Sequence, residues 1–240
     1  MSNLIVHGGT PLRGRVTPSA NKNAVLPILC ATLLTDQPLR LHGVPDITDV
    51  RKILDIFRTL GSEVRLDETT RTLDLHHRDT TFDATRHRLP EEMRSSIMLV
   101  SPLLARFGVA RLEDNVKGCT LGVREIDPHV DIFRSFGGEV ERASGSLLVR
   151  SAGPLKPTHH WLDYASVTTT ENFVLCAAAA AGESTLTNAA SEPHVQEFCR
   201  FMTMMGADID GIGTSRLAVR GGATLRGGEF TFEEDFHEIT

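Results

Sequence analysis

The sequence has few aromatic residues, no long apolar run and no excess of basic residues, and each absence excludes a class of protein. Only 5% of the 240 residues are aromatic, so we do not expect a platform on which nucleic-acid bases stack. The longest apolar runs, such as 173–181, are about half the roughly 18 residues of a membrane helix. The first residues lack the basic-then-apolar pattern of a signal peptide. We therefore expect a cytoplasmic protein with no membrane partner.

Charge and cysteine content narrow the choice further. The formal net charge of −6 disfavours a nucleic-acid partner, although a local basic pocket could still bind a small anion. The four cysteines match no zinc or redox spacing, so we expect reduced thiols. The adjacent pairs His76–His77 and His159–His160 would point to opposite faces of a strand, which makes them poor chelates. We expect no metal site.

What the chain does contain is an internal repeat. Three segments each have the pattern of an amphipathic helix that stops at a glycine and leads into a strand. The glycines, Gly61, Gly137 and Gly206, stand where a helix often ends in a residue with positive φ. The three segments are 45–64, 124–140 and 191–209.

A more uniformly apolar helix precedes each of these segments, at 24–34, 95–105 and 171–181. A helix that is apolar on nearly every face is buried. Each is followed by a strand, and a strand pair follows each glycine. We therefore predict an α/β (α+β) fold in which three βαβαββ units surround a pseudo-threefold axis, with helices inside and sheets outside. Ordinary α/β repetition without a shared axis is the alternative.

Polar residues open each apolar helix at matching places. Lys22 and Asn23 open the first, Arg94 opens the second, and a run of hydroxyl residues opens the third. Helix N-termini carry free N–H groups and a positive dipole end, so they favour anions. Each residue alone is more simply a cap or a solvated charge, but together they predict an anion site. The hydroxyl residues are Ser166, Thr168, Thr169 and Thr170.

Cys119 differs from the other thiols. Cys30, Cys176 and Cys199 lie in apolar helical runs and are expected in the core. Cys119 lies in a glycine-flanked polar stretch near Lys117 and Arg124. Neighbouring cations lower a thiol pKa and raise its reactivity. An incidental exposed cysteine is the alternative.

Several motifs, in order, resemble one enzyme family. They are SANKNAVLPILCATLL (19–34), MRSSIMLVSPLLARFG (93–108), GCTLGVREIDPH (118–129), SVTTTENFVLCAAAAAG (166–182), NAASEPHV (188–195) and MGADIDGIGTSRLAVRG (205–221). Together they are similar to the UDP-N-acetylglucosamine enolpyruvyl transferases (1-carboxyvinyltransferases), cytoplasmic enzymes of peptidoglycan synthesis and hence of cell-wall formation. The resemblance extends over essentially the whole chain.

The resemblance implies a fold, a reaction and a set of partners. The family has two inside-out α/β barrel domains, each with three of the units described above, and the substrates bind between them. Enolpyruvyl passes from phosphoenolpyruvate to the 3-hydroxyl of UDP-N-acetylglucosamine and phosphate leaves. No metal or organic cofactor is needed.

Residue roles follow from the motifs by the same resemblance. Lys22 would contact phosphoenolpyruvate and Asn23 the sugar nucleotide, while Arg94 and Arg124 would hold phosphate and carboxylate charges. Cys119 would be the general acid at the phosphoenolpyruvate methylene and the site of fosfomycin attachment. Aimed cations and a positioned acid suit this chemistry. The remaining contacts would be Ser166, Val167 and Thr168 at the diphosphate and Asp127 at the uridine.

The family is about twice as long as this chain, which sets the expected domain boundaries. Segment 1–21 would belong to a second domain, 22–236 would form one domain with repeats at about 22–90, 91–160 and 161–232, and 237–240 would begin a hinge. We therefore expect a fragment, or one piece of a split enzyme, that is inactive alone.

Three departures leave other functions open. Glu125 and Pro128 replace the residues usual at the uridine, and Tyr164 stands where a lysine is common. They favour, as an alternative, a paralogue that acts on a different nucleotide acceptor. A non-catalytic binding module of the same fold is a second alternative, and the shikimate branch is disfavoured by Cys119 and its loop.

Overall fold

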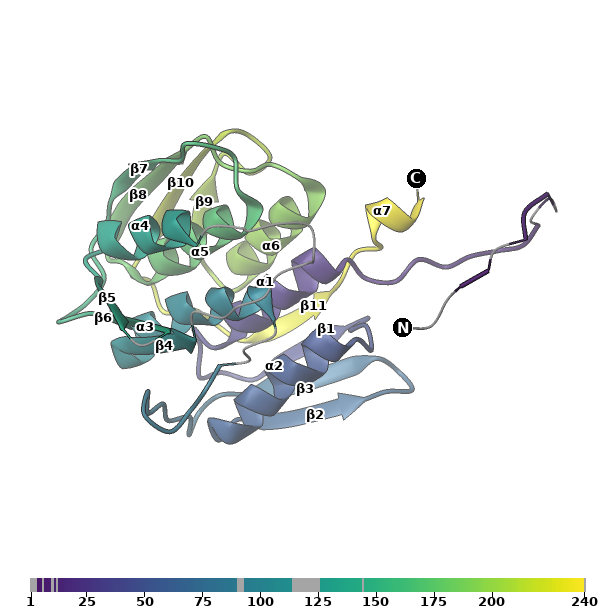
Figure 1. Cartoon of the computed structure of the whole chain (residues 1–240), viewed down its shortest axis with the longest axis horizontal. Helices are drawn as coiled ribbons and strands as arrows, with labels where there is room; N and C mark the ends of the chain where they lie inside the picture. The colour runs from purple at the N-terminus through teal and green to yellow at the C-terminus, as the bar shows by residue number, and fades with distance from the viewer. Residues whose placement is uncertain are drawn as a thin grey trace.

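The computed structural model describes residues 4–5, 7–9, 11, 13–89, 93–113, 126–143 and 145–239. Three helical stretches form its centre (Figure 1). They are α1 (Lys22–Thr32), α5 (Val167–Ala179), and the 3₁₀ helix η1 (Arg94–Leu99), which continues directly into α3 (Val100–Phe107). Nearly every residue of α1 and α5 is buried, as their uniformly apolar sequences predict.

The three amphipathic helices pack outside this centre. In each, apolar residues at helical spacing are buried, such as Val50, Ile53 and Phe57 in the first. The glycines after them have φ values of 91°, 91° and 106°, which confirms the predicted helix ends. These helices are α2 (Thr48–Thr59), α4 (Asp127–Ser135) and α6 (Pro193–Met204).

Two four-stranded sheets share one strand order, in which a parallel edge strand is followed by three antiparallel strands. The first sheet runs β11-β1-β3-β2 and the second runs β7-β8-β10-β9. Their strands are β1 (Leu39–His42), β2 (Glu63–Asp67), β3 (Thr72–His76) and β11 (Gly228–Thr231), then β7 (His159–Trp161), β8 (Gly182–Thr187), β9 (Asp208–Asp210) and β10 (Arg216–Gly221).

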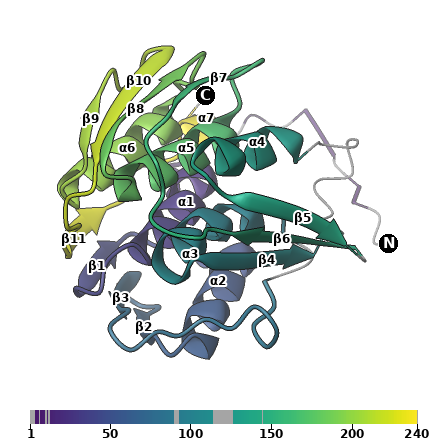
Figure 2. The same ribbon diagram turned by 90° about the vertical axis from the view of Figure 1, so that its left-hand side faces the viewer.

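A third sheet is antiparallel, in the order β4-β6-β5, formed by β4 (Val109–Glu113), β5 (Glu139–Ala143) and β6 (Ser146–Arg150). The three sheets lie around the central helices in both views (Figures 1 and 2). Their inward side chains, such as Leu41, Leu147 and Leu217, join one continuous core. The mixed α/β fold is therefore confirmed, whereas the threefold axis of an inside-out barrel stays a prediction.

The central helices end together. One hollow is lined by the last residues of all three, including Thr35 after α1, Ala105 of α3 and Ala178 of α5. Arg106 donates there to the carbonyls of Leu33, the C-cap residue of α1, and of His77, so a cation lies at the C-terminal end of α1. Near the start of α5, the Asn172 side chain donates to the Ile97 carbonyl of η1, so α5 and η1 lie side by side there.

Residues 19–21, just before α1, contact residues 235–238 near the C-terminus. The Ser19 hydroxyl donates to Glu238, and the Asn21 amide donates to Asp235. Asp235 lies just before the short C-terminal helix α7 (Phe236–Ile239). Residues 13–18 extend past α7 and away from the domain (Figure 1). No helix in the described part of the chain is long and apolar enough to cross a membrane.

Candidate functional site

Lys22 and Asn23 lie at the N-terminus of α1, as predicted. Asn21 caps this helix, because its side-chain oxygen accepts from the Asn23 N–H at 2.8 Å. Lys22 is exposed and its Nζ lies 2.6 Å from Asp49 of α2. Pro27 has no N–H, so the Asn23 carbonyl receives no helical hydrogen bond from that residue. Both side chains therefore stand at an exposed helix end that presents donors and a cation.

Arg94 and the start of α5 lie close to the same buried histidine. Ser166 caps α5, since its hydroxyl accepts from the Thr169 N–H at 3.4 Å. Val167 and Thr168 follow in the first turn and are half-buried. Arg94 begins η1, and its charge helps to lower the pKa of His129, whose ring contacts Thr168. The structure thus brings Arg94 and Thr168 together.

His129 is a residue of this region that sequence reasoning missed. It is fully buried in α4, with Nε2 3.2 Å from the Thr168 hydroxyl and Nδ1 2.9 Å from the Asn172 amide nitrogen. Burial, followed by the charge of Arg94, lowers its pKa to about 3. Nothing local could have revealed this contact, because the partners are 39 and 43 residues away.

Asp127 is the first residue of α4 and is held by an ion pair with Arg142 of β5. It therefore lies two residues before His129, in the first turn of the same helix. Cys119, Arg124 and Glu125 lie outside the described residues, so their expected places in the site stay predictions. The other three cysteines are buried, as predicted.

Two buried polar groups beside the site have no hydrogen-bond partner among the described residues. They are the Glu171 Oε1 atom and both ring nitrogens of His194. Burial, together with the charge of Glu192, raises the pKa of Glu171 well above its usual range, so the neutral carboxyl is favoured. His194 opens α6 and lies under Phe236, with ring centroids 5.9 Å apart. Neither residue was singled out from the sequence.

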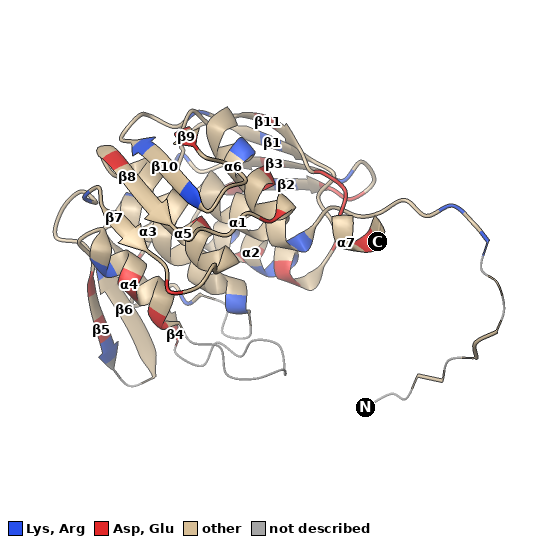
Figure 3. Ribbon diagram, turned by 90° about the horizontal axis from the view of Figure 1, so that it is seen from above, with Lys and Arg blue, Asp and Glu red and all other residues tan. Residues whose placement is uncertain are grey.

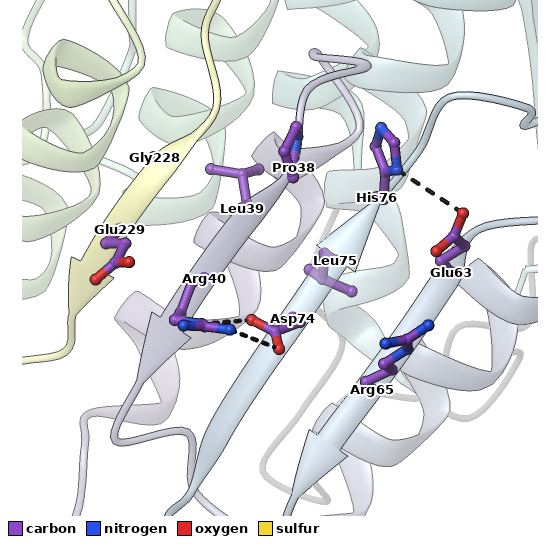
Figure 4. A pocket seen from close by; sticks show the side chains of 10 residues that line it. All are labelled: Pro38, Leu39, Arg40, Glu63, Arg65, Asp74, Leu75, His76, Gly228 and Glu229. Atoms are coloured by element: carbon purple, nitrogen blue, oxygen red, sulfur yellow. Dashed lines mark hydrogen bonds and ion pairs between the residues drawn. The ribbon is translucent and has the colours of Figure 1, made fainter.

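Another hollow lies on the outer face of the first sheet (Figure 4). Four of its charged or titratable side chains form two pairs with one another. Arg40 pairs with Asp74 at 2.7 Å, and His76 lies 3.8 Å from Glu63. His77, the next residue, is buried on the other face, as expected for neighbours on a strand. None of the predicted site residues lines this hollow, so it does not compete with the helix N-termini.

The starts of the core helices thus offer a set of hydrogen-bond donors and two cations from separate segments, which suits an anionic ligand.

The family model for EPSP synthase (3-phosphoshikimate 1-carboxyvinyltransferase) matches residues 6–239. The chain belongs to the EPSP synthase family. It is 37% identical over 227 residues to a protein of Rickettsia africae (strain ESF-5) named UDP-N-acetylglucosamine 1-carboxyvinyltransferase. A protein of the same name from Rickettsia rickettsii (strain Sheila Smith) is 38% identical over 229 residues.

Both matches cover 94% of this EPSP synthase-family chain and 54% of the relative, so the chain spans about half the length of these relatives. Two solved structures share the fold. The enolpyruvyl transferase NikO from Streptomyces tendae has a TM-score of 0.81 at 24% identity, covering 97% of this chain and 55% of its own. An EPSP synthase from Acinetobacter baumannii has 0.77 at 18% identity, covering 94% and 51%.

Proposed function

We propose that this chain is the part of a UDP-N-acetylglucosamine 1-carboxyvinyltransferase that supplies one wall of the active site. In this reaction enolpyruvyl would pass from phosphoenolpyruvate to the 3-hydroxyl of UDP-N-acetylglucosamine, and phosphate would leave. The observation that carries the proposal is that Lys22, Asn23, Arg94 and Ser166 each stand at the start of a helix of the buried core. The names of the 37–38% identical relatives support the choice of substrates.

Each residue would then have a distinct role. Lys22 would leave Asp49 to bind phosphoenolpyruvate, and Asn23 would bind the sugar. Arg94 and Arg124 would hold phosphate and carboxylate oxygens, and Asp127 would lie under the uridine. The start of α5, at Ser166, Val167 and Thr168, would donate to the diphosphate, because free N–H groups and the helix dipole favour that anion there.

Cys119 would protonate the phosphoenolpyruvate methylene, which needs an acid placed over the carbon. Two nearby cations would lower the pKa of this thiol, so that it gives up its proton readily in this step. Formation of the new C–O bond and proton transfer to the methylene give a tetrahedral adduct. Loss of phosphate and of a proton then regenerates the double bond. The same thiolate would be the site of attachment of fosfomycin.

We also propose that 22–236 is one domain, that segment 1–21 belongs to a second one, and that 237–240 begin the hinge to it. The exposed apolar residues Leu4, Ile5 and Val16 support this, since the described domain does not cover them. The second domain would be the missing partner, and the 240-residue chain would bind nucleotide without turnover.

The test is phosphate release from phosphoenolpyruvate in the presence of UDP-N-acetylglucosamine. We would use the product of the complete reading frame, with Cys119→Ala as the inactive variant and Cys199→Ala as the matched control. Release that needs Cys119 but not Cys199 is expected. If phosphate is not released and the 240-residue chain does not bind UDP-N-acetylglucosamine, the proposal is wrong. Labelling of Cys119 by phosphoenolpyruvate without release would indicate a different acceptor.

A further inference from the structure

The hydroxyl of Thr168 is part of a hydrogen-bond chain whose direction follows from its fixed end. The chain runs from the Ile97 carbonyl to the Asn172 side chain, then to His129, and then to Thr168. It joins η1, α5 and α4, and Asn172 and His129 are buried. Every polar atom along it therefore needs a partner with the correct role.

The Ile97 carbonyl sets the direction. A carbonyl only accepts, and it lies 3.4 Å from Asn172 Nδ2, so this atom is the amide nitrogen. The Ser101 hydroxyl donates to the other atom, Oδ1, at 2.5 Å, which agrees with that orientation. Asn172 must then donate its second N–H to His129 Nδ1 at 2.9 Å.

His129 therefore accepts at Nδ1. A neutral imidazole has one N–H, so the hydrogen is on Nε2. The ring stays neutral because it is buried beside Arg94. Its Nε2–H can only donate to the Thr168 hydroxyl oxygen, 3.2 Å away. In the described part of the chain, Thr168 Oγ1 has no second partner, so its own hydrogen is left for another acceptor.

We propose that His129 and Asn172 are positioning residues that make Thr168 a hydrogen-bond donor toward an anionic oxygen bound at the start of α5. The inference rests on the proposed function for the choice of anion, a nucleoside diphosphate. The fixed imidazole prevents Thr168 from turning its hydrogen inward. The ligand therefore meets an O–H, and a lone pair of Thr168 does not face its negative charge.

The first arm of the test reads the hydrogen-bond direction without a ligand. Nitrogen-15 NMR of the histidine-labelled chain distinguishes the two neutral tautomers, and loss of the signal in His129→Gln assigns it. We expect the Nε2–H tautomer in wild type and the Nδ1–H tautomer in Asn172→Asp, whose ionised carboxylate accepts from Nδ1. An Nδ1–H tautomer in wild type would overturn the inference.

The second arm measures UDP affinity by titration calorimetry. Thr168→Val should weaken UDP binding about tenfold, because it removes a hydrogen bond to a charged group, whereas Thr168→Ser should retain wild-type affinity. Thr32→Val is the matched control. Thr32 also bonds a buried histidine, His77 at 2.9 Å, but at the opposite end of the core. It should lower the melting temperature without changing UDP affinity.

The two arms separate the inference from the proposed function. If Thr168→Val binds UDP as tightly as wild type, Thr168 is not a donor to the ligand and the inference is wrong. If wild type has the Nε2–H tautomer but binds neither UDP nor pyrophosphate, the proposed function fails. The assignment of Thr168 to a ligand fails with it, while the hydrogen-bond direction stands.

Discussion

At the scale of single residues, burial sets the protonation of the interior. His77 and His129 are buried, and their pKa values are lowered to about 3. Glu171 is also buried, and its pKa is raised. In each case the neutral form is favoured, because the charged form would lose its hydration. The buried titratable groups beneath the proposed site are therefore expected to be uncharged. The charges that could act on a ligand lie at the surface of the core.

Glu171 predicts a pH-dependent effect of one substitution. The unfolded chain loses this proton near pH 4.3, whereas the folded chain keeps it to higher pH. Between these values the folded state binds more protons, so the stability contributed by Glu171 falls as pH rises. Glu171→Gln removes this loss. The difference in free energy of unfolding, Glu171→Gln minus wild type, should therefore be larger at pH 8 than at pH 4.

Urea unfolding at both pH values checks this prediction. Glu139→Gln is the control, since Glu139 is an exposed carboxylate and its replacement should change stability by the same small amount at each pH. A Glu171→Gln effect that does not depend on pH would mean that the folded state holds Glu171 ionised.

At the scale of elements, the sheets approach the core helices closely through glycine. A Cβ atom on Gly221 of β10 would lie 1.9 Å from the Ala177 carbonyl oxygen and 2.5 Å from that of Ala180, both on α5 or at its end. The next residue, Gly222, donates its N–H to the Ala178 carbonyl. The last turn of α5 is thus capped by backbone from β10, which only glycine allows.

Gly221→Ala should therefore lower the free energy of unfolding by about 2–4 kcal/mol, because β10 would have to move away from α5. Gly153→Ala is the matched control, since its Cβ would meet no described atom within 4 Å. Chemical denaturation of both variants gives the comparison. Equal stability of the two would show that β10 and α5 separate at little cost.

Local sequence patterns predicted the helices well, but they did not predict which elements pack or pair with one another. The all-apolar runs at 24–34 and 171–181 identified α1 and α5, since such helices can only be buried. The 3₁₀ start of the second helix was not predicted. Pro102 explains it, because it has no N–H to donate to the fourth residue before it, which lies in η1.

The sequence did not predict which strands far apart in the chain pair with each other. β11 pairs with β1, although 185 residues lie between His42 at the end of β1 and Gly228 at the start of β11. The sequence indicated a candidate site only at helix starts, as at Lys22, Arg94 and Ser166, and the roles of these residues stay predictions. His129 and Asn172 reach it through tertiary contacts, and an ordinary helical sequence does not reveal them.

At the scale of the whole molecule, the two ends of the core helices differ in the groups that they present. Arg106 donates to the Leu33 carbonyl at the end of α1, whereas Lys22 and Arg94 lie at the starts of α1 and η1. Elsewhere the acidic and basic residues are mixed over the outer elements (Figure 3), and most of the ion pairs are exposed. The anion binding that we propose would therefore be a local property, which the net charge of −6 does not oppose.

The single core that joins the sheets also predicts how the molecule opens. Cys30 of α1, Cys176 of α5 and Cys199 of α6 belong to one continuous cluster, and burial raises the pKa of each thiol. None can react until its helix leaves the core, and the three helices contact one another. Opening of one therefore exposes the others, so the three thiols should react as a single cooperative unit.

Thiol labelling in low urea, followed by mass spectrometry, tests this in a Cys119→Ser background. We expect chains with either no label or three, with the three peptides labelled at one rate that follows global unfolding. In native buffer without urea all three thiols should resist the reagent for as long as the chain stays folded. Faster labelling of Cys199 alone would mean that α6 detaches before α1 and α5, and that the proposed site can open without unfolding of the domain.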